Sequence, residues 1–213
     1  MLDYLIRNGM LVDGTGRPAY RADVGIADGR IAAIGDLQTA PAGTVIDAAG
    51  KYVTPGFIDI HRHADAAVFR PGFGELELKQ GLTTIVNGNC GLSVTPCQGA
   101  YKKEIQAYLT PITGAQPEDT DFSSLAAYLK AAEAEPRRIH TAMLTGSGTI
   151  RACAAGFGVP KLDRAQLEMV HKLLEQELAA GAMGVSLGLG YAPDCFYSTE
   201  ELIEACLLYT SPS

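Results

Sequence analysis

The pattern of apolar residues changes at about Pro55, and this change constrains the fold more than any other feature. Up to that point the chain consists of short alternating apolar runs separated by turn signals such as Asp28-Gly29, which is typical of β-hairpins. Beyond it, strand-like and helix-like segments follow one another, as in a parallel sheet covered by helices. We therefore expect a small antiparallel β domain of the sandwich kind over residues 1–55, followed by an α/β domain from residue 56.

The second part contains four strand-like segments and two helix starts. The strands are expected at residues 57–63, 83–90, 139–146 and 182–189. The clearest helix is expected over residues 162–180, where leucine and valine recur at helical spacing and Asp163 with Gln166 could cap the start. A second helix should begin at Ser198, whose pairing with Glu201 fits a capping box, and should end within about two turns.

The number of strands sets a limit on how much of a barrel is present. An eight-stranded (β/α)8 barrel takes roughly 250 residues, whereas the four expected units of this 213-residue chain amount to half of one. Residues 56–205 are therefore expected to form the first half of a barrel. The last segment, residues 206–213, does not continue this pattern, and we expect it to be foreign to the natural protein.

Charge and composition exclude several classes of partner. The chain has 17 Lys and Arg against 24 Asp and Glu, a net charge of -7, without a basic run, so nucleic acid and anionic membrane surfaces are poor partners. The start of the chain has no apolar stretch of signal-peptide length and no later run reaches the roughly 18 residues of a membrane span. We expect a cytoplasmic protein whose five cysteines are thiols.

Two histidines stand at the end of the first expected barrel strand. Side chains alternate along a strand, so Asp59, His61 and His63 share one face. Barrel enzymes build their active sites at the carboxyl ends of the strands, and two neutral imidazoles there could bind one divalent ion. Asp59 or Asp65 could orient a ring by accepting its other N–H group. The plainer alternative is that two loop histidines are close by chance.

A cysteine ends the second expected barrel strand. Cys90 follows a β-branched run and a glycine, Gly88, so it should lie at the same end of the sheet as the histidine pair. A thiolate there suits Zn²⁺, which accepts mixed sulfur and nitrogen ligands. Cysteines of intracellular proteins are more often small core residues, and spacing alone leaves that alternative open.

Four segments resemble a known family. Pro55-Gly-Phe-Ile-Asp-Ile-His61-Arg-His63 resembles the first-strand signature of the amidohydrolase superfamily, which has a small β domain before its barrel. The Gly88-Asn-Cys90-Gly segment resembles the second strand of the N-acyl-D-amino-acid deacylases, the D-aminoacylase group. The segments Gly146–Arg151 and Ala180–Pro193 are similar to the third and fourth strands of that group, and the resemblance continues to about residue 205.

The resemblance implies a fold, a metal and a reaction. The fold would be the amino-terminal part of a TIM-like (β/α)8 barrel, and the metal would be one or two Zn²⁺ ions with His61, His63 and Cys90 among the ligands. The reaction would be hydrolysis of the amide, a non-peptide C–N bond, of a small N-acyl-D-amino acid, releasing a carboxylate and a D-amino acid. Tyr191 matches a family tyrosine that binds the substrate carboxylate, although a half-buried loop tyrosine fits its position equally.

The catalytic acid/base of this group is an aspartate near the last barrel strand, so no catalytic residue is assigned in this chain, which is expected to be inactive alone. One position departs from the group, since Ser147 stands where Gly-His-Gly is usual, and this leaves the preferred D-amino acid open. Two alternatives remain. One is a dihydroorotase, dihydropyrimidinase or isoaspartyl dipeptidase, although no lysine between Lys172 and Ser213 could serve their carboxylated-lysine site. The other is a truncated product without activity.

Overall fold

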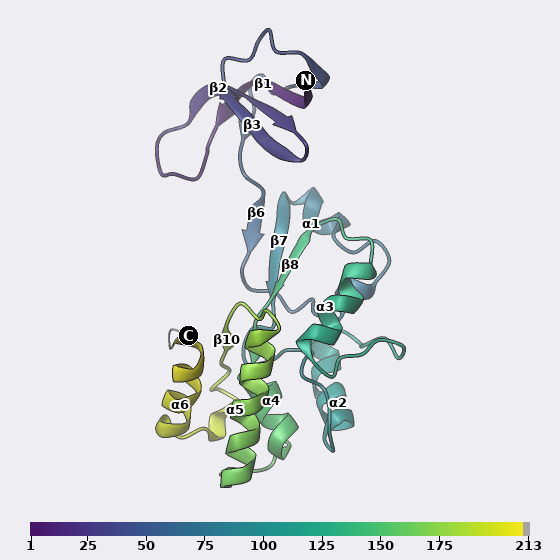
Figure 1. The fold of residues 1–213 in the computed structure, drawn as a ribbon, viewed down its shortest axis with the longest axis vertical. Coiled ribbons are helices and arrows are strands. Elements are labelled where there is room, and N and C mark those ends of the chain that lie inside the picture. The colour runs from purple at the N-terminus through teal and green to yellow at the C-terminus, as the bar shows by residue number, and fades with distance from the viewer. Residues whose placement is uncertain (211–213) are drawn as a thin grey trace. The chain divides into compact units, whose positions relative to one another are not determined.

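Figure 1 shows the computed structural model, which describes residues 1–210. Contacts between residues divide the chain into two units, Met1–Gly56 and a second unit that starts at Phe57. Among the described residues, no helix combines the length and apolar character that a membrane span requires. Residues 211–213, which belong to the expected foreign tail, lie outside the described residues, so that expectation stays a prediction.

The first unit is one mixed sheet, where an antiparallel sandwich was expected. Its strands are β1 (Leu2–Leu11), β2 (Tyr20–Ala27), β3 (Arg30–Gly35), β4 (Ala42–Asp47) and β5 (Tyr52–Val53). The hairpin strands β1, β2 and β3 pair antiparallel, but β4 and β5 pair parallel with the other edge of β1. The antiparallel expectation is wrong for these two strands because local turn signals report hairpins and carry no information about a connection that crosses to the far edge.

The second unit contains two short parallel sheets. The strands β6 (Phe57–Asp59), β7 (Leu82–Asn87) and β8 (His140–Met143) form the first, in that order. The strands β9 (Thr145–Gly146) and β10 (Val185–Ser186) form the second. All but Leu82, which precedes the expected segment 83–90 by one residue, lie within the four segments expected as strands. Each strand is shorter than expected because the backbone turns away soon after its pairing ends. Parallel pairing brings the carboxyl ends of β6 and β7 to the same edge.

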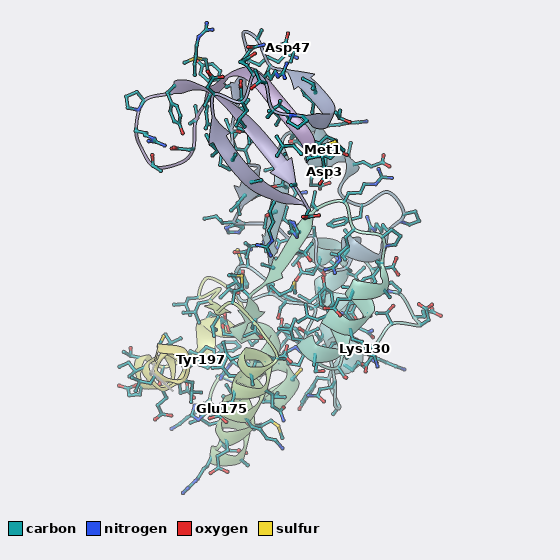
Figure 2. All side chains as sticks on the ribbon, turned by 45° about the horizontal axis from the view of Figure 1, so that its top comes forward. Met1, Asp3, Asp47, Lys130, Glu175 and Tyr197 are labelled. Atoms are coloured by element: carbon teal, nitrogen blue, oxygen red, sulfur yellow. The ribbon has the colours of Figure 1, made fainter. Side chains whose placement is uncertain are left out.

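Helices connect these strands. The longer ones are α2 (Lys102–Thr113), α3 (Leu125–Ala134), α4 (Ser147–Ala155), α5 (Arg164–Ala179) and α6 (Thr199–Thr210), and the short ones are α1 (Glu75–Lys79), η1 (Ala67–Phe69) and η2 (Asp194–Phe196). The expected capping box of α5 is confirmed, since the Asp163 side chain and the Gln166 side chain each bond the other residue's backbone N–H. Exposed charged side chains such as Lys130 and Glu175 are carried by α3 and α5 (Figure 2).

The helix α6 is longer than expected. Ser198 and Glu201 form the expected reciprocal cap, at 2.8 and 3.2 Å, but the helix then continues to Thr210 and does not end after two turns. Ala205 is buried and Leu208 packs against the same apolar cluster as residues of α4 and α5. This burial stabilises a segment that sequence pattern alone did not support.

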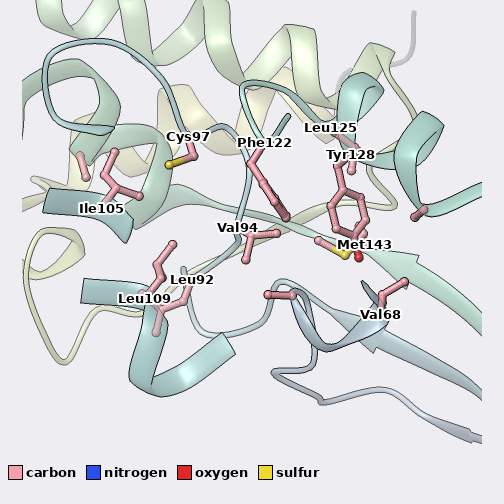
Figure 3. Packing of buried hydrophobic residues seen from close by; sticks show 13 residues of the cluster. Val68, Leu92, Val94, Cys97, Ile105, Leu109, Phe122, Leu125, Tyr128 and Met143 are labelled. Carbon is pink, nitrogen blue, oxygen red and sulfur yellow. The ribbon is translucent and has the colours of Figure 1, made fainter. Parts of the chain in front are cut away.

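The main apolar core of the second unit is formed largely by side chains of α2, α3 and the segments that follow β6 and β7. Aromatic rings of Phe69, Phe122 and Tyr128 pack against one another with centroids 5.5 to 6.0 Å apart, and Val94 and Met143 pack beside them (Figure 3). Because the segment after β7 enters this core, its backbone is held on one side by buried apolar side chains.

Candidate metal centre

The histidine pair lies just beyond its strand. Pairing of β6 ends at Asp59, so His61 and His63 are in the following segment and not inside a strand of residues 57–63. This segment still runs beside β7, because the Arg62 N–H donates to the Val86 carbonyl at 3.0 Å. The backbone therefore keeps the direction of the strand while its side chains leave the sheet.

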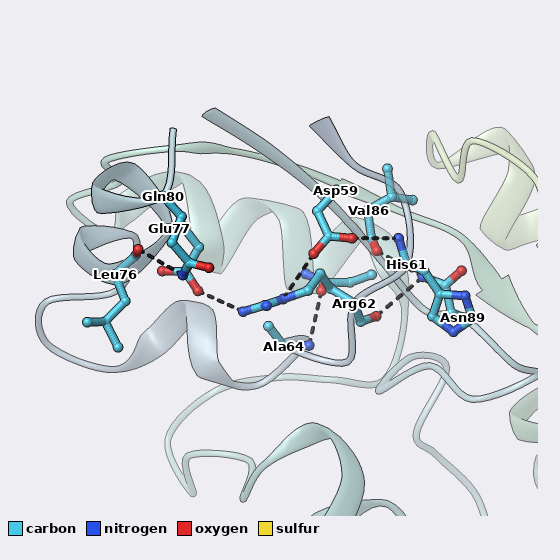
Figure 4. A network of polar contacts seen from close by, with 10 residues as sticks. Asp59, His61, Arg62, Ala64, Leu76, Glu77, Gln80, Val86 and Asn89 are labelled. Atoms are coloured by element: carbon cyan, nitrogen blue, oxygen red, sulfur yellow. Dashed lines mark hydrogen bonds and ion pairs between the residues drawn. The ribbon is translucent and has the colours of Figure 1, made fainter. Parts of the chain in front are cut away.

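Polar contacts hold this segment in place (Figure 4). The Asp59 carboxylate accepts a hydrogen bond from the His61 backbone N–H at 3.1 Å, and the Arg62 guanidinium pairs with Glu77 at 2.8 Å. The Asn89 side chain donates to the carbonyls of Val86 and Arg62 at 2.8 and 3.3 Å, and so joins the segment after β7 to the histidine segment. The ion pair with Glu77 directs the Arg62 side chain toward α1.

Cys90 lies in the turn that follows β7. The strand ends at Asn87, and Cys90 adopts a φ of 59° between two glycines, Gly88 and Gly91, that also have positive φ. A residue other than glycine in this left-handed region costs of the order of 1–3 kcal/mol and is maintained only where surrounding contacts determine it. The Cys90 side chain is half-buried.

The three predicted ligands converge. Ligand atoms of His61, His63 and Cys90 all lie within 4.8 Å of one another, and the His61 Nε2 atom is 3.1 Å from the Cys90 Sγ atom. Tetrahedral zinc, with bonds of about 2.1 Å to nitrogen and 2.3 Å to sulfur, places such ligands roughly 3.5 Å apart. The arrangement is therefore close to that of a zinc site, and a mixed thiolate and imidazole set suits this ion.

The state of His63 supports metal binding. Its Nδ1 atom is buried and has no hydrogen-bond partner, an arrangement that is costly unless another group occupies that side of the ring. Burial, assisted by the neighbouring His61, lowers the pKa of His63. A lowered pKa favours the neutral imidazole, which is the form that binds a metal.

The two carboxylates expected to orient these rings are placed differently from each other. The Asp59 carboxylate accepts the hydrogen bond from the His61 backbone N–H and also pairs with the Arg62 guanidinium, 3.7 Å away. Asp65 is fully buried, and burial raises the pKa of its carboxyl group to about 7, offset in part by backbone N–H groups including that of Gly88. Among the described residues, neither carboxylate accepts a hydrogen bond from a histidine ring in the structure, so their role at the rings stays a prediction.

Tyr191, in the segment between β10 and η2, contacts the same turn. Its hydroxyl donates to the Cys90 carbonyl, across 101 positions of sequence, and its ring is partly exposed. Burial, with the neighbouring Cys90, raises the pKa of Tyr191 to about 12. The phenol is therefore a neutral hydrogen-bond donor at the turn that carries Cys90; its expected contact with substrate stays a prediction.

Ser147, the position expected to depart from the group, is the first residue of α4 and is buried. Its hydroxyl donates to the Asp194 carboxylate at 2.5 Å, and the Gly188 N–H donates to the same oxygen at 2.7 Å. Burial raises the pKa of Asp194, and these two hydrogen bonds offset part of the shift. Sequence reasoning gave no role to Asp194; the only signal was an acid within the apolar and glycine-rich stretch after residue 184.

Comparisons with known proteins also find similarity to amidohydrolases. A model of the amidohydrolase family matches residues 44–136. The D-aminoacylase of Alcaligenes xylosoxydans xylosoxydans is 38% identical over 208 residues, which cover 96% of this chain and 41% of that enzyme. The chain thus spans about two fifths of the length of this curated relative.

Solved structures of this group share the fold. A crystal structure of D-aminoacylase superposes with a TM-score of 0.84 at 34% identity, covering 98% of this chain and 44% of that one. The N-acyl-D-glutamate deacylase of Bordetella bronchiseptica, solved with zinc and a phosphonate that mimics the tetrahedral intermediate, gives 0.82 at 36% identity over 97% of this chain and 42% of that one. The predicted fold class, part of a TIM-like (β/α)8 barrel, is confirmed.

Proposed function

Because this chain is a relative of the D-aminoacylases in the amidohydrolase family, we propose that the protein hydrolyses the amide bond of N-acyl-D-amino acids with zinc. The observation that carries the proposal is the convergence of His61, His63 and Cys90 at the ends of two neighbouring strands. The products would be a carboxylate and a D-amino acid. The chain spans about two fifths of its relatives, so this activity is proposed for the whole protein.

The three side chains have complementary tasks in this proposal. Bound zinc supplies Lewis-acid chemistry, polarising the acyl carbonyl and lowering the pKa of water. His61 and His63 contribute neutral nitrogen ligands, and Cys90 contributes a negative one that reduces the net charge of the centre. Asp59 fixes the direction of the histidine segment through the His61 backbone N–H.

Substrate orientation is proposed to involve Tyr191. The hydroxyl lies at the Cys90 carbonyl, beside the ligand set, and a phenol has one O–H to donate. When a substrate carboxylate enters, the O–H would turn from the carbonyl to the anion, since hydrogen bonds to charged acceptors are the stronger ones. The neutral state that the raised pKa ensures is the state that can make this bond.

The proposal is tested by the stereochemistry and the metal dependence of hydrolysis. The full-length gene product is supplied with N-acetyl-D- and N-acetyl-L-amino acids as matched pairs, and released amino acid is measured. We expect release from the D-forms, its loss after treatment with a chelator, and its return with Zn²⁺. Equal rates on both enantiomers would refute the D-aminoacylase assignment, and full activity after removal of all metal would refute the zinc site.

A further inference from the structure

The turn that carries Cys90 has a backbone conformation that needs support. Cys90 has a φ of 59°, and Gly88, two residues before it, and Gly91, directly after it, have φ of 74° and 70°. The two glycines adopt such angles freely, but a cysteine does not. Without external contacts the turn would sample other conformations, and the thiol would leave the position 3.1 Å from His61 Nε2.

A single hydroxyl bridges the two ends of this turn. Ser186, on β10, is buried; its Oγ atom accepts a hydrogen bond from the Gly91 N–H at 2.9 Å and donates one to the Gly88 carbonyl at 2.5 Å. A serine hydroxyl has one proton to donate and can accept at the same time, so both capabilities are used. Gly88, two residues before Cys90, and Gly91, directly after it, are thereby held by one atom, 95 or more positions away in sequence.

Close packing restricts the position of this turn. A Cβ atom added to Gly188 would lie 2.2 Å from the Cys90 carbonyl oxygen, and one added to Gly91 would lie 2.3 Å from the Asp194 carboxylate. Backbones that approach this closely exclude any side chain between them. The Cys90 turn therefore packs directly against the segment that follows β10, the strand that carries Ser186.

From this geometry we infer that Ser186 is a positioning residue for Cys90, fixing the turn so that the thiolate faces the histidine pair. The inference rests on the proposed function, in which Cys90 is a metal ligand. Ser186 itself does not contact the ligand atoms in this account; it acts through the backbone on either side of the ligand. Hydrogen bonds that orient a ligand in this indirect way commonly contribute about 10- to 100-fold to metal affinity.

The test uses the full-length gene product with Ser186→Ala and Ser186→Thr. Zinc affinity is measured by competition with a chelator, and the cobalt-substituted protein reports the thiolate through its sulfur-to-metal charge-transfer absorption. We expect S186A to weaken zinc binding about 10- to 100-fold and to reduce the charge-transfer band, and S186T, which keeps the hydroxyl on a strand that accepts β-branched residues, to remain near the wild type. Ser124→Ala is the matched control, because it removes a hydroxyl that bonds the backbone at the start of α3.

Cys90→Ala measured in parallel separates the two claims. If C90A keeps the wild-type zinc affinity and cobalt spectrum, the proposed metal site itself fails. If C90A loses both while S186A matches the wild type, only the role of Ser186 is overturned. Should S186A fail to fold, S186T decides: wild-type affinity supports the inference, whereas weakened binding at an unchanged melting temperature contradicts it.

Discussion

The Nε2 atom of His61 lies 3.1 Å from the Sγ atom of Cys90, although 29 positions of sequence separate the two residues. The parallel pairing of β6 with β7 accounts for this contact, because it brings the ends of both strands to one edge of the sheet. The Asn89 side chain then ties the turn after β7 to the Arg62 carbonyl. Two neighbouring strands and one amide therefore define most of the candidate centre.

Replacing Tyr191 by Phe tests its proposed contact with substrate. Loss of a hydrogen bond to a charged group costs about 1.5–3 kcal/mol, so we expect KM for an N-acetyl-D-amino acid to rise roughly 10- to 100-fold with zinc content unchanged. Steady-state kinetics and metal analysis of the same preparation check this. A fall in zinc affinity with an unchanged KM would instead show that the phenol serves only the Cys90 carbonyl.

Ser147→Ala should destabilise the protein through Asp194. The Ser147 hydroxyl is one of two donors to the buried Asp194 carboxylate oxygen, and removing a donor from a buried charged group costs about 1–3 kcal/mol. The measurement is chemical denaturation of S147A alone and combined with Asp194→Asn. The cost of S147A should be smaller in the D194N background, because a neutral acceptor depends less on the donor. Equal costs in both backgrounds would contradict the coupling.

Glu177 should make stability depend on pH. Burial raises the pKa of its carboxyl group above the ordinary 4.5, and hydrogen bonds from the Leu125 N–H and the Thr95 hydroxyl offset part of the shift. Below pH 4.5 both the folded and the unfolded chain hold the proton; above it only the folded chain does, so rising pH favours unfolding until the folded pKa is passed.

We therefore expect the melting temperature of the wild type to fall relative to that of Glu177→Gln as pH rises from about 4.5. Glutamine keeps an oxygen that can accept from Leu125 N–H, the contact observed at 2.9 Å. Glu175→Gln, on the exposed face of the same helix, is the control and should show no such trend. A difference between wild type and E177Q that stays constant across this range would refute the effect of burial.

Much of the fold could be predicted because its signals are local. Helical spacing and the Asp163 cap gave α5 within two residues at each end, and the four strand segments contain β6 to β10 except for Leu82 at the start of β7. The parallel pairing of β4 with β1 was not predictable, since it depends on a connection that crosses the sheet. The length of α6 was missed because burial of Ala205, a tertiary contact, supports it.

The candidate site, like the fold, could be predicted from the sequence only in part. The strand context of His61 and His63 follows from alternation and position, whereas the assignment of Cys90 depended on resemblance, because a lone cysteine at a strand end has no distinctive spacing. Ser186 and Asp194 could not be found from sequence, since a serine in a two-residue strand and an acid at the start of a three-residue 3-10 helix carry no periodic signal. Their roles depend on contacts across more than 40 positions, from Ser186 to Gly91 and from Ser147 to Asp194.

The central claim is that Cys90 completes a zinc site with His61 and His63, and zinc affinity of Cys90→Ala in the full-length gene product tests it most directly. Cys195→Ala, at an exposed cysteine, is the control. We predict that C90A weakens zinc binding by more than the roughly 10- to 100-fold that loss of a supporting hydrogen bond costs, while C195A binds as the wild type does. Zinc affinity of C90A equal to that of the wild type and of C195A would contradict the account.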